Sequence, residues 1–210
     1  AVLFFVLALL LINYYNVESN FNQNAKQIQS DFQKNESKLQ DNVKVLFDIV
    51  NDSYDANSLY DFLISSDKNF VFYVFHRDSL LFWSSNAIAI NSYSQIKSLK
   101  NNSVFEIANS IVFLSFLTNY DVAVYGFMPI YKNYPYQNKF LNNSFSSVFD
   151  YRDDLVASIE TNTKSDIFNS AGDPLFSVSN VSVYEFSSYM VFIVVFFICL
   201  FWFFLIFGFF

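Results

Sequence analysis

Residues 21–50 read FNQNAKQIQSDFQKNESKLQDNVKVLFDIV, and this stretch decides the fold. Its apolar side chains recur mostly in steps of three and four, which is the spacing of one face of an α-helix. They are Phe21, Ala25, Ile28, Phe32, Leu39, Val43, Leu46 and Val50. The run of Asn, Asp and Ser at 51–57 competes for backbone hydrogen bonds, so we expect the helix to end there.

Asn35 and Asn42 interrupt this apolar stripe. Polar groups inside such a stripe can set the register when a helix pairs with a second copy of itself, which predicts a homodimer. The alternative is that the stripe packs on its own domain. The sequence leaves both possibilities open.

The pattern changes to strands after residue 69. Ser58 is positioned to cap a short second helix that carries Leu59 and Phe62. Apolar and aromatic runs then predict strands at 70–76, 79–84, 103–108, 111–118 and 121–131, with Arg77 and Asp78 in the turn of the first hairpin. A last hairpin is predicted over 167–178. A long N-terminal helix and an antiparallel sheet of about five strands make an α+β domain, which we interpret as PAS-like or Cache-like.

Both ends of the chain lack charge. Residues 1–17 and 186–210 contain no Asp, Glu, Lys or Arg, and Met190 to Phe210 is an unbroken apolar run. As a helix this run spans roughly 31 Å, which matches the hydrocarbon core of a bilayer. We therefore expect two transmembrane helices flanking the domain, the first of them truncated; a cleaved signal peptide is the alternative for the first.

These patterns divide the chain into four parts. We predict a truncated transmembrane helix at 1–15, a long extracytoplasmic helix at 16–52, a sensor domain at 53–185 and a second transmembrane helix at 186–210. The expected location is the inner (cytoplasmic) membrane, with the central domain in the periplasm and the lipid bilayer as a partner.

Composition excludes several classes of function. The net charge of −7 and only two arginines argue against a nucleic-acid partner. The single cysteine, Cys199, lies in the C-terminal apolar run, so no disulfide framework is expected. We predict no catalytic residues, no cofactor and no metal site. His76 is the single histidine and is interpreted as a structural or surface residue, and Asp150, Asp153 and Asp154 are interpreted as a solvated turn.

Aromatic residues are the candidates for ligand binding. Tyr73, Trp83, Tyr125, Tyr134 and Tyr136 would give a pocket an apolar wall with a few hydroxyl groups, which is how small-molecule sites are commonly built. Because the chain has fourteen tyrosines, core packing is the alternative explanation for most of them.

Three segments resemble a known family. DSLLFWSSN at 78–86, YPYQNKFLNNSF at 134–145, and the hairpin 167–177 with Gly172 are similar to the N-terminal extracytoplasmic sensor region of Bacteroides-type membrane sensor histidine kinases. The resemblance implies a two-component system in which an outside domain, in a homodimer, answers a small molecule or an envelope protein. It also implies a cytoplasmic kinase domain beyond residue 210 and a response regulator as partners.

Two functions from different classes therefore follow. The first is an extracytoplasmic signal-sensing and transmembrane signalling segment of a sensor histidine kinase, with no enzyme activity in this segment. The alternative is a structural or scaffolding membrane protein whose outer domain binds another protein and transmits nothing.

Overall fold

The computed structural model describes residues 2–52, 56–90, 92–149, 155–161 and 165–180, together with Ile193 and Phe196, and the side chains of 2–18, Ala56 and Leu63 lie outside this description. Three helices occur in it: α1 (Val2–Asp52), α2 (Ala56–Ser65) and α3 (Tyr93–Lys97). The strands are β1 (Val71–His76), β2 (Ser79–Trp83), β3 (Ser103–Ile107), β4 (Ser110–Thr118), β5 (Val122–Lys132), β6 (Ser144–Phe145), β7 (Leu155–Ser158), β8 (Asp166–Phe168) and β9 (Pro174–Asn180).

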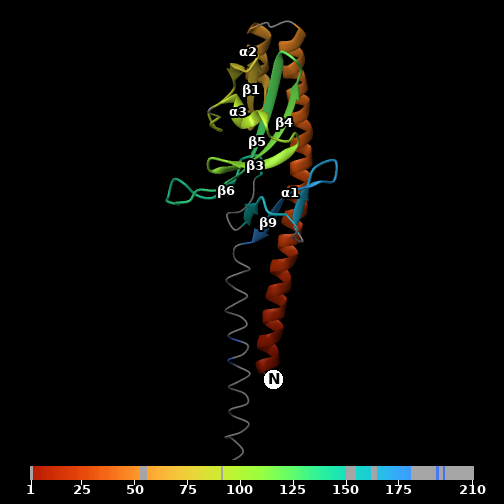
Figure 1. The fold of residues 1–210 in the computed structure, drawn as a ribbon. Coiled ribbons are helices and arrows are strands. Elements are labelled where there is room, and N and C mark those ends of the chain that lie inside the picture. Colours follow the sequence, from red (N-terminus) through yellow and green to blue (C-terminus); the bar gives the residue numbers. More distant parts are fainter. Residues whose placement is uncertain are drawn as a thin grey trace, which may run out of the picture.

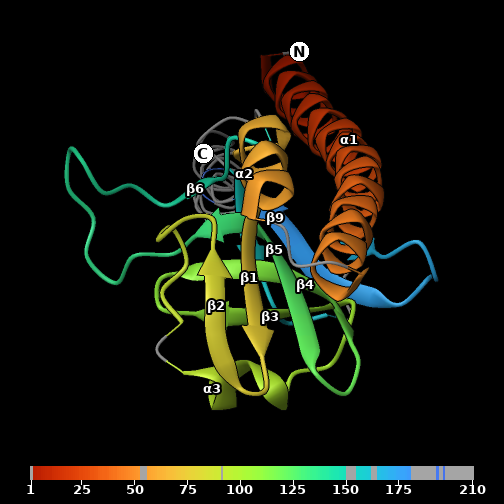
Figure 2. The same cartoon turned by 90° about the horizontal axis from the view of Figure 1, so that it is seen from above.

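The main sheet is antiparallel and has the strand order β2-β1-β5-β4-β3, with β6 paired to the end of β5. Strand β5 lies at its centre, so strands distant in sequence become neighbours: Phe72 lies opposite Gly126, and His76 opposite Val122. Figures 1 and 2 show α1 running along one side of this sheet, whereas α3 lies on the other side. The sheet is therefore covered on both faces by its own chain.

The apolar stripe of α1 packs on its own domain. Ile28, Phe32, Leu39 and Leu46 are each fully buried in the cluster between α1 and the main sheet. Burial of this kind stabilises a fold by about 1.5–3 kcal/mol for each large apolar side chain. Of the two explanations for the stripe, the structure therefore supports packing within the domain.

Helix α1 passes very close to β5 at Gly126. A Cβ atom on Gly126 would lie 2.5 Å from Val43 Cγ2 and 2.9 Å from Leu39 Cδ1. Real side chains do not approach so closely, so glycine is what allows the helix to lie against the centre of the sheet.

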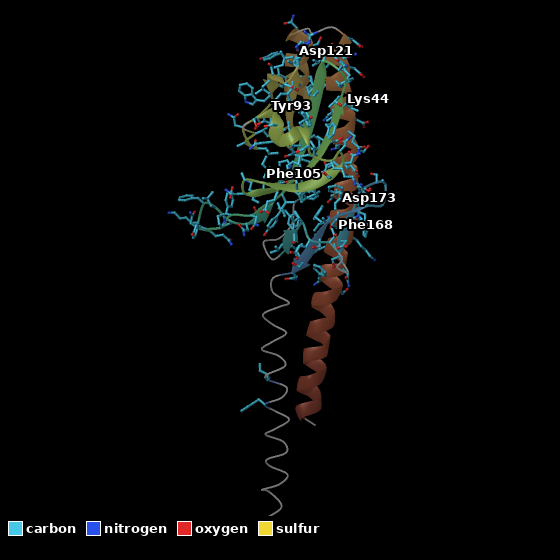
Figure 3. All side chains as sticks on the ribbon, in the orientation of Figure 1. Lys44, Tyr93, Phe105, Asp121, Phe168 and Asp173 are labelled. Atoms are coloured by element: carbon cyan, nitrogen blue, oxygen red, sulfur yellow. The ribbon has the colours of Figure 1, made fainter. Side chains whose placement is uncertain are left out.

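The second face of the main sheet has its own apolar cluster. Tyr73, Tyr125 and Phe127 extend from the strands, and Ile88 and Ile96 cover them from the segment that includes α3. Figure 3 places Tyr93 and Phe105 on this side, away from Lys44 on α1.

A three-stranded second sheet has the order β7-β9-β8 and lies beside α1. The sequence predicts the hairpin β8–β9 but neither β7 nor a separate sheet. Likewise α2 begins at Ala56, two residues before the predicted cap at Ser58.

The hairpin β1–β2 turns through Arg77 and Asp78, as the sequence predicts. Their φ angles are +47° and +67°. Two consecutive left-handed residues are typical of a type I′ turn, whose twist suits an antiparallel hairpin. Neither residue is glycine, so this turn is held in a conformation that costs free energy for an L-residue.

No helix among the described residues combines the length and apolar character needed to cross a membrane. This finding overturns the prediction of two transmembrane helices flanking the domain. Apart from Ile193 and Phe196, the predicted second span at 186–210 lies outside the described residues, as do Asp150, Asp153 and Asp154.

Candidate functional site

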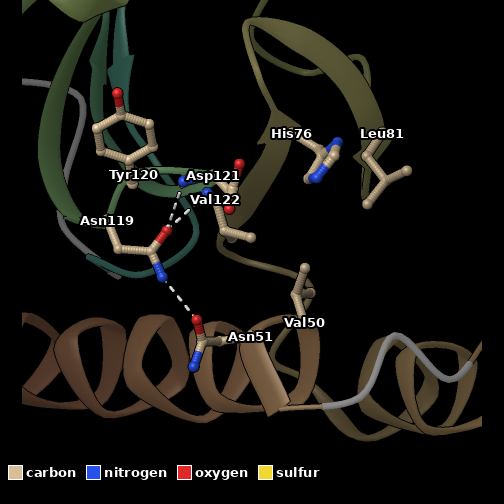
Figure 4. A pocket seen from close by; sticks show the side chains of 8 residues that line it. All are labelled: Val50, Asn51, His76, Leu81, Asn119, Tyr120, Asp121 and Val122. Carbon is tan, nitrogen blue, oxygen red and sulfur yellow. Dashed lines mark hydrogen bonds between the residues drawn. The ribbon is translucent and has the colours of Figure 1, made fainter.

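A recess opens at the end of the domain farthest from residue 2, and we call it the distal recess (Figures 3 and 4). It encloses about 580 Å³, within the range of small-molecule sites. Residues from the end of α1, from β1 and β2, and from the β4–β5 turn line it. They are Val50, Asn51, His76, Leu81, Asn119, Tyr120, Asp121 and Val122.

Asn119 fixes the β4–β5 turn against the end of α1. Its Oδ1 accepts hydrogen bonds from the backbone N–H groups of Asp121 (2.9 Å) and Val122 (2.7 Å). Its Nδ2 donates to Oδ1 of Asn51, at 2.6 Å. Figure 4 shows this chain of contacts running from the helix to the turn. These hydrogen bonds hold the β4–β5 turn against the last turn of α1.

Arg77 ties the same turn to the β1–β2 hairpin. Its Nε lies 2.7 Å from Oδ1 of Asp121, and its backbone N–H donates to the carbonyl of Asp121 at 2.9 Å. The hydrogen bond from Arg77 lowers the pKa of the Asp121 carboxyl. Because both side chains are well exposed, the pair adds little to stability. Its effect is to position the edge of the recess.

The lining offers both apolar and polar contacts. Val50, Leu81 and Val122 supply aliphatic surface, whereas the imidazole of His76 and the carboxylate of Asp121 can donate or accept hydrogen bonds. Such a mixture suits a small molecule with an apolar body and one or two polar groups. In the described part of the chain, no three His, Cys, Asp or Glu side chains gather closely enough to hold a metal ion.

Two of the predicted ligand-binding aromatics, Tyr73 and Tyr125, lie together in the core. They are register partners on β1 and β5, and both rings contact Phe75, at centroid distances of 6.5 and 6.0 Å. The Tyr73 hydroxyl donates to the carbonyl of Ile88 at 2.6 Å. Both side chains are buried, at 4% and 2% exposure. In this structure they pack the second face of the sheet.

The other three predicted aromatics are more exposed than this pair. Trp83 is opposite Tyr73 in register but is half exposed on the edge strand β2, and its indole N–H donates to Asn86. Tyr134 is half-buried, and Tyr136 is 85% exposed on the segment 133–143. None of the five lines the distal recess.

Segment 133–143 projects from the domain beside β6, as the long loop in Figure 2 shows. It is internally braced: the Tyr134 N–H donates to Oδ1 of Asn143 (2.7 Å), and Asn138 closes a tight turn with Leu141. Phe140 is 81% exposed at that turn. A braced loop that exposes aromatic side chains is typical of protein-binding surfaces.

The buried tyrosines predict a loss of stability at alkaline pH. Burial raises the pKa of Tyr125, Tyr73 and Tyr131 above the ordinary value of 10.0. Above pH 10.0 the unfolded chain therefore releases protons that the folded chain retains, so the free energy of unfolding should fall as pH rises. Urea unfolding followed by circular dichroism at increasing pH measures this slope. In the Tyr125→Phe variant the unfolding free energy should fall less steeply with pH. An equal fall in this variant would contradict the contribution of the buried Tyr125 hydroxyl.

Sequence reasoning named His76 but did not assign it to a binding site, and it did not predict the rest of the recess. The recess depends on β1 pairing with β5, which brings His76 next to Val122. The sequence feature that pointed toward the recess was the end of one predicted strand at His76 and the start of another at Asp121. Pairing between strands so distant in sequence does not follow from local pattern.

No protein-family model matches this chain, and no curated protein or solved structure shows significant similarity to it.

Proposed function

We propose that this chain is the signal-sensing segment of a two-component sensor histidine kinase, and that the distal recess binds the signal. The observation that carries the proposal is the construction of the recess. Its walls come from α1, from the β1–β2 hairpin and from the β4–β5 turn, and hydrogen bonds join these elements directly at its edge.

A ligand in this recess can alter how the three elements meet. It would lie next to Asn51 at the end of α1 and next to Asp121, which Arg77 holds. A signal shifts an equilibrium between two states only by its difference in affinity for them, typically about 1–3 kcal/mol. A ligand that contacts several elements would gain such a difference from two states that place those elements differently.

The remaining parts of the proposal rest on the resemblance of segments 78–86, 134–145 and 167–177 to sensor kinases. In this proposal the domain lies in the periplasm at the inner membrane, the lipid bilayer is a partner, and the chain forms a homodimer. Output would pass to a cytoplasmic kinase domain of the same protein and then to a response regulator. The segment itself would carry no enzyme activity.

Binding to the distal recess is tested by measuring thermal stability with added compounds, first in the unchanged chain and then in a variant whose recess is occupied by a larger side chain. The probes are a panel of amino acids, aliphatic amines, sugars and short carboxylic acids, each added to the chain during thermal unfolding. A compound present at about 100 times its Kd should stabilise the chain by about 2.7 kcal/mol. Leu81→Trp should abolish that stabilisation by occupying the recess.

Leu80→Trp is the matched control, because Leu80 is an exposed neighbour on β2 that does not line the recess. It should leave the ligand effect unchanged. Stabilisation that persists in Leu81→Trp would place binding elsewhere and contradict the assignment of the distal recess.

A second candidate function, protein binding without signalling, is favoured by the projecting segment 133–143. Tyr136 and Phe140 are largely exposed on a braced loop, and such aromatic side chains often dominate binding energy at interfaces. Under this proposal, Phe140→Ser abolishes binding of an envelope protein, whereas Leu81→Trp leaves it intact. The opposite pattern would exclude this candidate.

A further inference from the structure

Glu36 of α1 is a buried carboxylate bound to the β8–β9 turn. The residue is 2% exposed, and its Oε2 accepts hydrogen bonds from the backbone N–H (2.9 Å) and the Oγ (2.6 Å) of Ser170. Among the residues that the structure describes, the ion pairs are Arg77–Asp121 and Lys97–Asp78, so Glu36 takes part in none of them. A carboxylate loses its hydration on burial, so these two hydrogen bonds must replace it. Separating Glu36 from Ser170 would return water to both groups.

Gln29 contacts the same hairpin two helical turns earlier. Its Nε2 donates to the carbonyl of Phe168 (2.7 Å), and its Oε1 accepts from the N–H of Phe168 (2.8 Å). One side chain thus satisfies both backbone groups of a residue on β8. Gln29 and Glu36 are seven residues apart, which places them on the same face of α1.

Between these two polar contacts lies a purely apolar one. Phe32 and Phe176 are both fully buried, and their ring centroids are 5.7 Å apart in an edge-to-face arrangement. Three positions of α1 therefore hold the hairpin, and we call them the hairpin clamp: Gln29, Phe32 and Glu36. Figure 3 shows Phe168 and Asp173 of the hairpin beside the helix.

The turn that the clamp holds is braced internally. Oδ1 of Asn169 accepts from the N–H groups of Ala171 (3.0 Å) and Asp173 (2.8 Å). Gly172 adopts φ +89°, which glycine permits without steric cost. A turn that carries its own hydrogen bonds keeps its shape when its external contacts change. The β8–β9 turn therefore presents the Ser170 N–H to Glu36 in a defined shape, and β9 is itself paired with β7.

The same helix also reaches the distal recess. Asn51 lies fifteen residues after Glu36, about 22 Å along the helix axis. We infer that the hairpin clamp couples the two sites: a change at the recess displaces α1, and the clamp passes the displacement to the β8–β9 hairpin. This inference rests on the proposed function and extends it, because it names the contacts through which the signal leaves the main sheet.

Hydrogen exchange tests whether the clamp is a separate unit. In the full chain, Glu36→Gln should speed the exchange of backbone amides in 165–180 about tenfold or more, because the two hydrogen bonds from Ser170 to a carboxylate oxygen become weaker bonds to an amide oxygen. Amides of β1 and β5 should keep their rates. Glu160→Gln, the same change at an exposed position, should alter neither. Equal acceleration in β1, β5 and 165–180 would overturn the inference.

Asn119→Ala tests the coupling itself, because it removes the hydrogen bond to Asn51 at the recess. It should also speed exchange in 165–180, and this effect should disappear when Glu36→Gln is already present. Unchanged exchange in 165–180 after Asn119→Ala would overturn the inference. If Glu36→Gln does not fold, Gln29→Ala takes its place, since its hydrogen bonds lie at the exposed surface.

These results separate the inference from the proposed function. Coupling between Asn119 and the hairpin needs no ligand, so it can hold in a chain that binds none of the probe compounds. Conversely, the loss of ligand stabilisation in Leu81→Trp would support the distal recess as the binding site. If Asn119→Ala then left hydrogen exchange in 165–180 unchanged, the hairpin clamp would play no part in transmitting the signal.

Discussion

Phe32→Ala should lower the free energy of unfolding by about 3–5 kcal/mol, the usual cost of truncating a fully buried aromatic side chain. The Phe32 ring is fully buried and contacts both sheets: Phe113 of β4 at 5.2 Å and Phe176 of β9 at 5.7 Å between centroids. Alanine would leave a cavity where α1 meets the two sheets, and rigid neighbours on both sides limit how far it can collapse.

Urea unfolding followed by circular dichroism measures this loss. Phe140→Ala is the matched control, because Phe140 is 81% exposed and its truncation should change stability by no more than about 0.5 kcal/mol. Similar losses in the two variants would contradict the position of Phe32 between the sheets.

Gly126→Ala is expected to destabilise the fold by about 1–3 kcal/mol, although it adds a single methyl group. The added Cβ would lie 2.5 Å from Val43 Cγ2 and 3.3 Å from Phe72 Cε1. Valine has essentially one χ1 rotamer in a helix, so Val43 cannot turn away, and α1 itself must shift from the sheet.

A second substitution isolates this clash. Val43→Ala alone leaves a cavity and should destabilise the chain, but it also removes the atom nearest to the new methyl group. In the double variant the loss should therefore be smaller than the sum of the two single losses, as measured by urea unfolding. Strict additivity would show that α1 does not lie against Gly126 as described.

Local patterns predicted much of the fold. The spacing of three and four in 21–50 indicated the buried face of α1, and the structure buries Ile28, Phe32 and Leu39 along it. The β1–β2 hairpin and its turn at Arg77 and Asp78 were also predicted, because a two-residue connection depends only on neighbouring residues. The prediction of transmembrane helices was wrong for the described residues, among which no helix is both long and apolar enough to span a membrane.

What the sequence could not predict depends on contacts between distant residues. The order of the main sheet places β1 beside β5, and the distal recess exists only because of that pairing. Nor could aromatic content show where each ring lies: Tyr73 and Tyr125 pack in the core with Ile88, and their role in ligand binding stays a prediction. Strand β7 has only four residues, too few to give a clear alternation.

The bonds between Gln29 and Phe168 join residues 139 positions apart, which matters while the chain is being made. At a synthesis rate of about 5–20 residues per second, roughly 7–28 s pass before the hairpin that covers this face of α1 leaves the ribosome. During that interval the Phe32 side chain lacks its β9 partner, Phe176, and transiently exposed apolar surface of this kind promotes aggregation.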